Sequence, residues 1–355
     1  MQYQSTILTH PSLARDQAST FFRTQRTREY REQLGPATPR GASSSSTLRT
    51  IAWNALGNRI AAVSSPIHGT HIIRIWNPER ADSRYSTELK GHTGMIDCVA
   101  WDPTFSDRLV SCSAADGTVR LWDARLNRTL QIFRSGTVGI EPVFVRFTPD
   151  GRWLVVSGQR GRKLLVLDAV TLQVAGAGLF TDSRPQDGDI TRAIVTFSGD
   201  VLAIGYSTGV VKLHSFDPST GEIGKDPLVS LNAHRTSITC LEFDPCGRYL
   251  ALGSNDSLVS IWDVQELVCV RTFAKYAQAV KCISISFDGA YMAISVEGVE
   301  PIEIVHVESG EYVYSVPRST PFHVPALEWH PTKYWLAYAG DPGGLKIVGT
   351  PDDRR

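Results

Sequence analysis

The stretch that decides the fold is Gly253-Ser-Asn-Asp-Ser-Leu-Val-Ser-Ile-Trp-Asp-Val-Gln-Glu-Leu-Val-Cys-Val-Arg-Thr-Phe273. A polar turn precedes alternating apolar residues that end at Trp262-Asp263, and a second alternating run extends from Val268 to Phe273. Alternation with a period of two is typical of β-strands. Two such strands joined by a turn, with a Trp-Asp pair between them, are the unit of a β-propeller blade. The stretch therefore predicts further copies of this unit along the chain.

Seven copies follow from Leu48 onward, each an apolar strand that ends in a large anchor residue, a short polar turn and a second apolar strand. The anchors are Trp53, Trp101, Phe147, Phe197, Phe243, Ile285 and Trp329. They recur every 42–50 residues, close to the roughly 40–45 residues of a four-stranded blade. Turns such as Thr148-Pro-Asp-Gly151 carry Pro early and Gly last, as a tight turn requires. We expect an all-β, seven-bladed WD40 β-propeller.

Three regions are expected. Residues 1–47 form an N-terminal arm with Ser43–Ser46 and many arginines, and we expect it to be partly disordered. The propeller spans 48–350, and 351–355 form a C-terminal tail. The last copy ends near Val348 without a fourth strand, so we expect a segment near 26–33 to supply that strand and close the ring. The arginines of the arm favour either a solvated arm with this closing strand or contacts with RNA and nuclear targeting.

Composition excludes several classes of protein. The chain has 355 residues, and its 36 Lys and Arg are balanced by 36 Asp and Glu, so no global field points to nucleic acid or a membrane. It contains no run of 18 apolar residues and no secretory signal, so we expect no membrane association. The six cysteines form no Cys-x-x-Cys pair, which predicts buried thiols in a reducing compartment and no metal. We expect no cofactor.

Two repeats contain the residues of a buried hydrogen-bond chain that is typical of WD repeats. The second has His92, Ser111, Asp116 and Trp122, and the fifth has His234, Ser254, Asp256 and Trp262. A histidine beside a carboxylate is also the arrangement of a general base. Because the pair recurs at the same repeat position, we interpret these residues as structural. We predict no catalytic residues and no enzyme activity.

Two surface features remain open. Arg160, Arg162 and Lys163 form a basic cluster in a turn of the third blade, with Arg146 and Arg152 near in sequence. This cluster is either a solvated loop or a contact for a partner or RNA phosphates. The longest insertion between blades, 176–189, is either a partner-binding element or a tolerated surface loop.

The stretch from Asn232 to Phe273 closely resembles the fifth blade of the THO complex subunit 3 family, above all in the run Leu258-Val-Ser-Ile-Trp-Asp-Val-Gln-Glu-Leu-Val-Cys-Val-Arg271. The resemblance continues through Ser286–Gly289, Val307–Gly310, Ala326–Pro331 and Gly344–Val348, and covers most of residues 21–352. The chain departs from the family in the serine tract before the first blade, the short turn at Asp341 and the long 176–189 insertion. We identify it as a fungal-type member.

The resemblance implies a non-catalytic scaffold subunit of the nuclear THO assembly, which couples transcription to mRNA packaging and export. It implies the other THO subunits as partners, especially the large helical scaffold subunit, with messenger ribonucleoprotein contacted indirectly and direct RNA contact possible. The alternative is a WD-repeat adaptor of another nuclear complex, either a chromatin-peptide reader or a ubiquitin-ligase substrate receptor. The fold by itself does not distinguish these functions.

Overall fold

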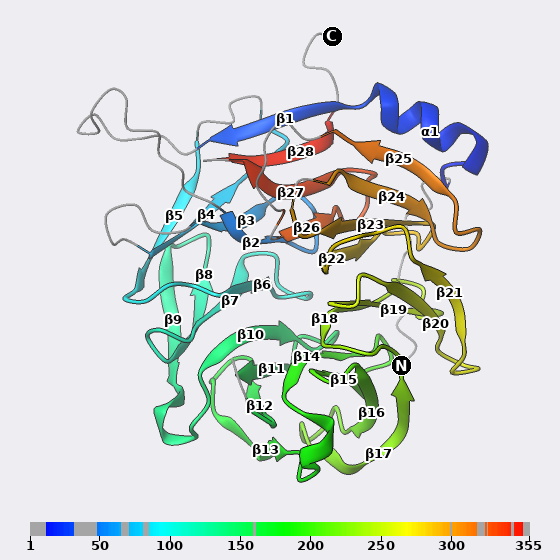
Figure 1. The fold of residues 1–355 in the computed structure, drawn as a ribbon. Helices are drawn as coiled ribbons and strands as arrows, with labels where there is room; N and C mark the ends of the chain where they lie inside the picture. Colours follow the sequence, from blue (N-terminus) through cyan, green and yellow to red (C-terminus); the bar gives the residue numbers. More distant parts are fainter. Residues whose placement is uncertain are drawn as a thin grey trace.

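A computed structural model of the chain describes residues 12–31, 48–64, 71–80, 85–158, 161–298, 300–317, 324, 326–341 and 344–350. Within these residues, seven four-stranded antiparallel sheets are arranged in a ring (Figure 1). In each sheet one strand lies near the axis and the last lies at the rim. The structure confirms the predicted seven-bladed β-propeller.

Six blades are built from strands that are consecutive in the chain. Blade 1 contains β2 (Leu48–Trp53), β3 (Ile60–Ser64), β4 (His71–Trp76) and β5 (Thr87–His92). Blade 2 contains β6 (Cys98–Trp101), β7 (Arg108–Ser113), β8 (Thr118–Asp123) and β9 (Arg128–Arg134). Blade 3 contains β10 (Pro142–Phe147), β11 (Trp153–Gly158), β12 (Lys163–Asp168) and β13 (Val174–Thr181).

The second half of the ring repeats the pattern. Blade 4 contains β14 (Ile190–Val195), β15 (Val201–Tyr206), β16 (Val210–Phe216) and β17 (Ile223–Asn232). Blade 5 contains β18 (Ile238–Phe243), β19 (Tyr249–Ser254), β20 (Val259–Asp263) and β21 (Cys269–Phe273). Blade 6 contains β22 (Val280–Ile285), β23 (Tyr291–Val296), β24 (Ile302–His306) and β25 (Tyr312–Val316). Blade 7 contains β26 (Ala326–Trp329), β27 (Leu336–Asp341), β28 (Gly344–Thr350) and β1 (Arg26–Arg31). The helical elements are α1 (Arg15–Thr24), η1 (Ser135–Thr137) and η2 (Pro185–Asp187).

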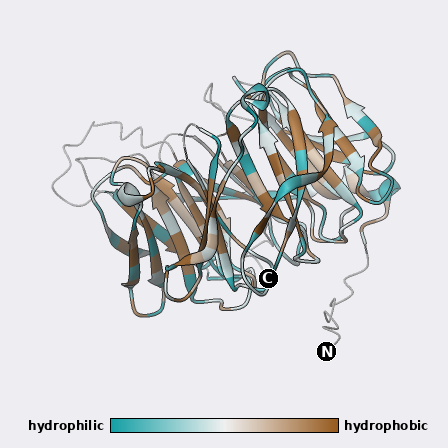
Figure 2. Cartoon of the chain, turned by 90° about the horizontal axis from the view of Figure 1, so that it is seen from below, coloured by the Kyte–Doolittle hydropathy of each residue, from teal (hydrophilic) through white to brown (hydrophobic). Residues whose placement is uncertain are grey.

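The hydrophobic core lies between the blades. Within the described residues, buried apolar side chains form seven clusters, and each cluster joins two neighbouring blades. The cluster between blades 6 and 7 also contains Ala18 and Phe22 of α1. Figure 2 shows hydrophobic residues along the strands and hydrophilic residues at many of the turns. Because both faces of a blade are buried against neighbours, strands such as β19 are buried at every position instead of alternating with solvent. Every blade therefore depends on the two beside it.

One anchor assignment is wrong. Phe197 was expected to end the first strand of blade 4, but β14 ends at Val195 and Phe197 lies in the following turn with 57% of its surface exposed. Val195 is buried and pairs with Leu202, as Trp53 pairs with Ile60 in blade 1. With this correction the turn in blade 4 has the same length as those of blades 1, 3, 5, 6 and 7.

Two of the cysteines also differ from expectation. Cys98, Cys112 and Cys240 are buried, but Cys246 and Cys269 are exposed. Cys246 lies in the turn between β18 and β19, and Cys269 begins the outer strand of blade 5. Cys246 is surrounded by exposed turn residues, and Cys269 lies between the exposed Val268 and Val270.

The ring is closed by a strand from the N-terminal region. β1 pairs antiparallel with β28, with Thr27 opposite Val348 and Tyr30 opposite Leu345. The Tyr30 ring is buried against Trp76 of blade 1, and its hydroxyl donates to the Pro78 carbonyl at 3.3 Å. The described residues do not include the other segments of the arm, 1–11 and 32–47, or the tail 351–355. The expected disorder of the arm falls on those segments and stays a prediction.

Helix α1 fastens this closing strand to blades 6 and 7. Phe22 is buried, with its ring 5.5 Å from Tyr291 and 5.9 Å from Trp329. The backbone of Leu13 binds two tyrosines, because its N–H donates to the Tyr334 hydroxyl and its carbonyl accepts from the Tyr291 hydroxyl, both at 2.8 Å. The helix therefore bridges the last two blades beside the closure (Figure 1).

We predict that deletion of residues 1–34 lowers the melting temperature by more than about 6 °C, because it removes the outer strand of blade 7 and exposes the surface that α1 covers. Differential scanning calorimetry measures this change. An unchanged melting temperature would count against closure by β1.

A point variant separates the helix from the strand. Phe22→Ala leaves β1 intact and removes a buried aromatic ring, so we expect it to destabilise the fold by about 3–5 kcal/mol. Arg23→Ala, at the exposed neighbouring position, is the matched control and is expected to change stability by less than about 0.5 kcal/mol.

Candidate functional site

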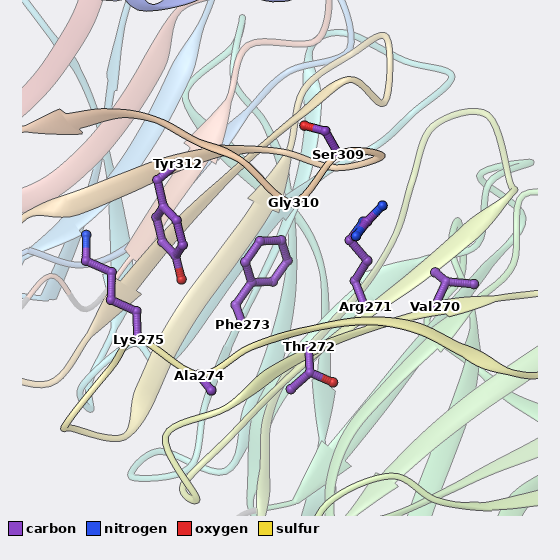
Figure 3. A pocket seen from close by; sticks show the side chains of 9 residues that line it. All are labelled: Val270, Arg271, Thr272, Phe273, Ala274, Lys275, Ser309, Gly310 and Tyr312. Carbon is purple, nitrogen blue, oxygen red and sulfur yellow. The ribbon is translucent and has the colours of Figure 1, made fainter.

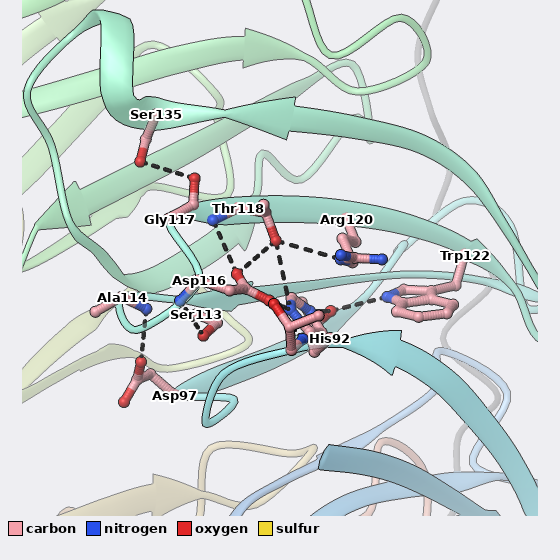
Figure 4. A network of polar contacts seen from close by, with 12 residues as sticks. His92, Asp97, Ser113, Ala114, Asp116, Gly117, Thr118, Arg120, Trp122 and Ser135 are labelled. Atoms are coloured by element: carbon pink, nitrogen blue, oxygen red, sulfur yellow. Dashed lines mark hydrogen bonds and ion pairs between the residues drawn. The ribbon is translucent and has the colours of Figure 1, made fainter. Parts of the chain in front are cut away.

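A buried chain of hydrogen bonds links His92, the last residue of β5, to Asp116 in the turn before β8 (Figure 4). Because its other members belong to blade 2, it is called here the histidine chain of blade 2. His92 Nδ1 is 2.7 Å from Asp116 Oδ2, and His92 Nε2 is 2.7 Å from Ser111 Oγ. Trp122 Nε1 donates to the same Ser111 oxygen at 2.8 Å. The structure thus brings together the four residues that the sequence singled out in this repeat.

One arrangement of protons satisfies every group in this chain. Trp122 has only an N–H to donate, so Ser111 Oγ accepts from it and donates its own proton to His92 Nε2. His92 then donates from Nδ1 to Asp116. Burial lowers the pKa of His92, which agrees with a neutral imidazole. Its side chain is 0% exposed and both nitrogens are occupied, so it has no free lone pair to act as a general base.

Asp116 is held as a carboxylate although its side chain is only 4% exposed. Burial alone would raise its pKa, but hydrogen bonds from His92 and from the Thr118 hydroxyl, which donates at 2.6 Å, hold that pKa well below its ordinary value. The Thr93 N–H also donates to this carboxylate at 3.1 Å. The aspartate therefore ties the turn before β8 to the segment that precedes β6.

Blade 5 builds the same chain with a different serine. His234 Nε2 is 2.8 Å from Ser260 Oγ, and Trp262 Nε1 donates to that oxygen at 2.9 Å. Asp256 lies 3.1 Å from His234 Nδ1. The expectation for Ser254 is wrong, since its hydroxyl donates to the Thr236 carbonyl instead.

The register of the strands explains this substitution. Leu109 pairs with Trp122 in blade 2 and Leu250 pairs with Trp262 in blade 5, so the position of Ser111 is taken in blade 5 by Leu252, which has no hydroxyl. Ser260 lies two residues before Trp262 on the same strand and supplies the missing group. A serine two residues before the Trp of a Trp-Asp pair was the sequence signal for this role.

Blade 4 replaces the histidine chain by an ion cluster. Asp182, just after β13, accepts the Tyr206 hydroxyl at 2.6 Å and the Lys212 ammonium at 2.8 Å. Lys212 is 2% exposed and also binds Asp187. Burial would raise the pKa of Asp182, but the hydrogen bonds from Lys212 and Tyr206 lower it to about 2.

This cluster corrects the view of 176–189 as a loop. Residues up to Thr181 belong to the outer strand β13, and η2 follows at Pro185–Asp187. Asp182 and Asp187 then bind the buried Lys212 of β16. The segment is thus partly strand and is tethered to blade 4.

Side chains near the axis join four successive blades, from blade 5 round to blade 1, at three junctions. At each junction, the residue before the anchor accepts the backbone N–H of the next blade's anchor: Glu242 Oε1 from Ile285 at 3.0 Å, Ser284 Oγ from Trp329 at 3.2 Å, and Glu328 Oε2 from Trp53 at 2.9 Å. Burial raises the pKa of Glu242 to about 8 and that of Glu328 to about 7. None of these residues stands out in the sequence, because a lone glutamate or serine in a strand carries no distinctive pattern.

The five basic residues of the third blade do not form one surface. Arg146, on β10 near the axis, donates to the Val99 carbonyl at 3.2 Å. Arg152 is exposed just before β11, whereas Arg162 and Lys163 lie at the start of β12. Because β11 crosses the blade between these points, Arg152 and Lys163 lie on opposite faces of the ring. Arg160 lies outside the described residues.

Among the residues that the structure describes, no group of three or more His, Cys, Asp or Glu is placed to hold a metal ion. In the same part of the chain, no helix has the length and apolar character needed to span a membrane.

The chain is similar in sequence to a repeat family and to several known proteins. The model of the WD domain, G-beta repeat family matches residues 83–123 and 225–263, which contain the two histidine chains. THO complex subunit 3 of Arabidopsis thaliana is 35% identical over 83% of this chain and 86% of its own length. WD repeat-containing protein AAC3 of Dictyostelium discoideum is 31% identical over 82% of this chain and 61% of its own length. Protein TEX1 of Saccharomyces cerevisiae is 21% identical over 72% of this chain.

Among solved structures, the Cps50 (Swd1) β-propeller domain of Myceliophteria thermophila superposes with a TM-score of 0.69. The match covers 87% of this chain and 97% of that one at 19% sequence identity. This likeness supports the fold.

Ser111→Ala tests the histidine chain of blade 2. The change leaves Trp122 Nε1 and His92 Nε2 buried without their partner, so we expect the free energy of unfolding to fall by about 1–3 kcal/mol. Urea denaturation followed by tryptophan fluorescence measures the change. Ser183→Ala, at an exposed position, is the control and is expected to have little effect.

Glu242→Gln tests whether the raised pKa of a buried carboxylate makes the stability of the protein depend on pH. Because the pKa of Glu242 is raised from 4.5 to about 8 in the fold, the stability that its proton contributes is complete below about pH 4.5 and is lost as pH rises through about 8. Glutamine keeps an oxygen for the Ile285 N–H and does not ionise. The parent therefore loses stability as pH rises and the variant does not. We expect the free energy of unfolding of the variant, relative to that of the parent, to rise by at least about 1 kcal/mol from about pH 5 to about pH 8.

Urea denaturation at both pH values measures the difference, and Glu266→Gln in an exposed turn is the matched control. A difference between Glu242→Gln and the parent that is the same at both pH values would contradict the proposed burial of this charge.

Proposed function

The chain belongs to the THO complex subunit 3 family, and from this membership we propose that it is a scaffold subunit of a THO complex that couples transcription to mRNA packaging and nuclear export. The observation that carries the proposal is the 35% identity, which extends over 86% of the length of the Arabidopsis relative. The WD-repeat propeller supports a role in protein assembly, since the rigid ring offers exposed turns and a rim to several partners.

The proposed role is non-catalytic. The two histidine–aspartate pairs are the strongest catalytic candidates in the described part of the chain, and both are occupied in internal hydrogen bonds. Their side chains are almost fully buried, so a substrate would have to unfold part of a blade to reach them. This arrangement favours a structural role over general base catalysis.

The proposed partners are the other THO subunits, especially the large helical scaffold subunit, in the nucleus. The chain would be a fungal-type member of the family. The separation of the basic residues of blade 3 onto different faces favours an indirect contact with messenger ribonucleoprotein, through those subunits. A phosphate-binding surface would need several cations on one face.

Affinity purification of the tagged chain, with mass spectrometry and with or without ribonuclease, tests this function. We expect the other THO subunits in stoichiometric amounts after ribonuclease treatment, because the proposed contacts are between proteins. Their loss with ribonuclease would instead indicate a bridge of RNA. Recovery of a chromatin complex or a ubiquitin ligase without THO subunits would replace the proposal with the WD-adaptor alternative.

A further inference from the structure

A groove separates the outer edges of blades 5 and 6 (Figure 3). Its volume is about 450 Å³, and its lining includes Arg271, Phe273, Lys275, Ser309, Gly310 and Tyr312. The floor is aromatic, since the Phe273 and Tyr312 rings meet edge to face with their centroids 6.0 Å apart. Figure 3 shows Arg271 and Lys275 on either side of these two rings.

One wall of the groove is the outer strand of blade 5. Among the residues that the structure describes, β21 is the last strand of its sheet and pairs only with β20, so one edge of its backbone has no strand partner there. Its first four residues are all exposed, and Val268 and Val270 present apolar side chains to solvent. An exposed apolar edge of this kind is a template for pairing with a further strand.

The groove has one uncompensated positive charge. Lys275 binds Glu303 at 2.7 Å, and Arg248 binds Glu308 at 2.7 Å, so these charges are balanced. Arg271 donates from Nε to the Glu308 backbone carbonyl at 2.6 Å, and no carboxylate in the described part of the chain pairs with it. This bond fixes the direction of the guanidinium and leaves its terminal N–H groups available for a planar anion.

We propose that β21 and this groove bind an extended, acidic segment of a partner protein, which adds a fifth strand to blade 5 and places a carboxylate beside Arg271. The proposal rests on the chain being a subunit of a protein assembly, as argued above. It goes further by assigning the surface and the chemistry of the segment.

The alternation of β21 defines what such a segment would present. Arg271 and Phe273 both contact blade 6, whereas Thr272 between them points to the other side of the strand (Figure 3). A segment paired alongside would direct every second side chain into the groove. An acidic side chain opposite Arg271 and an apolar one opposite Phe273, two residues apart, match the lining.

Hydrogen–deuterium exchange tests the strand pairing, with the full chain measured alone and in its natively purified assembly. We expect backbone amides within 269–273 to exchange more than about tenfold more slowly in the assembly, because paired amides are protected. The amides of the equivalent outer strand β9 of blade 2 serve as the internal reference. Equal exchange of 269–273 in both states would overturn the proposal.

Charge reversal tests the anion. We expect Arg271→Glu to reduce recovery of the groove-bound partner by at least about tenfold, and Arg271→Lys, which keeps the charge, to reduce it less. Arg134→Glu, an exposed arginine on β9, is the matched control and should leave recovery unchanged. Melting temperatures of the variants are compared with the parent, so that a folding defect is separated from a binding defect. Full recovery with folded Arg271→Glu would refute the acidic segment.

The outcomes separate this inference from the proposed function. If the THO subunits assemble but the β21 amides are not protected from exchange, binding of a segment at the groove is refuted and the proposed function stands. Protection of β21 by other proteins would support the groove and refute the THO assignment. Protection that disappears after ribonuclease treatment would identify nucleic acid as the occupant and overturn the proposal of a protein strand.

Discussion

The hydrogen-bond ladder between β1 and β28 is the constraint on which the rest of the ring depends. It pairs a segment at residues 26–31 with one at 344–350, and so joins opposite ends of the chain within one blade. Each of the seven apolar clusters needs a blade on both sides. Without the ladder, blade 7 would lose its outer strand, and the buried contact of Tyr30 with Trp76 would be lost with it. Helix α1 supports the same junction by burying Phe22 among aromatic residues of blades 6 and 7.

Polar contacts give the blades a second level of order. Blades 2 and 5 join their turns through histidine and aspartate, whereas blade 4 uses Asp182 and a buried lysine at the corresponding place. Near the axis, Glu242, Ser284 and Glu328 each bind the backbone of the following blade. These different residue sets meet one requirement, which is that polar groups buried between hydrophobic layers must be paired. A repeat can therefore lose the WD signature and keep its place in the ring.

The distribution of these contacts separates interior from periphery. The strongest candidates for chemistry have their hydrogen-bonding groups engaged within and between blades; they are His92, His234, the buried carboxylates and Lys212. The exposed apolar and cationic groups lie elsewhere, at turns such as that of Phe197 and on the outer strand β21. In such a protein the interior groups stabilise the fold, and the rim and the turns are the surfaces accessible to partners. This division agrees with an assembly role for a member of the THO complex subunit 3 family.

The sequence by itself determined the blade number, the turns between strands and the need for a closing strand, because each depends on a local period or on counting repeats. It also located the histidine chain of blade 2. Tertiary structure decided which serine completes the chain of blade 5, since the choice between Ser254 and Ser260 depends on strand register. It separated Arg152 from Lys163, because a strand that crosses the blade carries sequence neighbours to opposite faces. Only the tertiary structure revealed the groove beside Arg271, because its walls come from two blades. The charge of Arg271 has no carboxylate partner in the described part of the chain, because the nearby Glu303 and Glu308 bind Lys275 and Arg248.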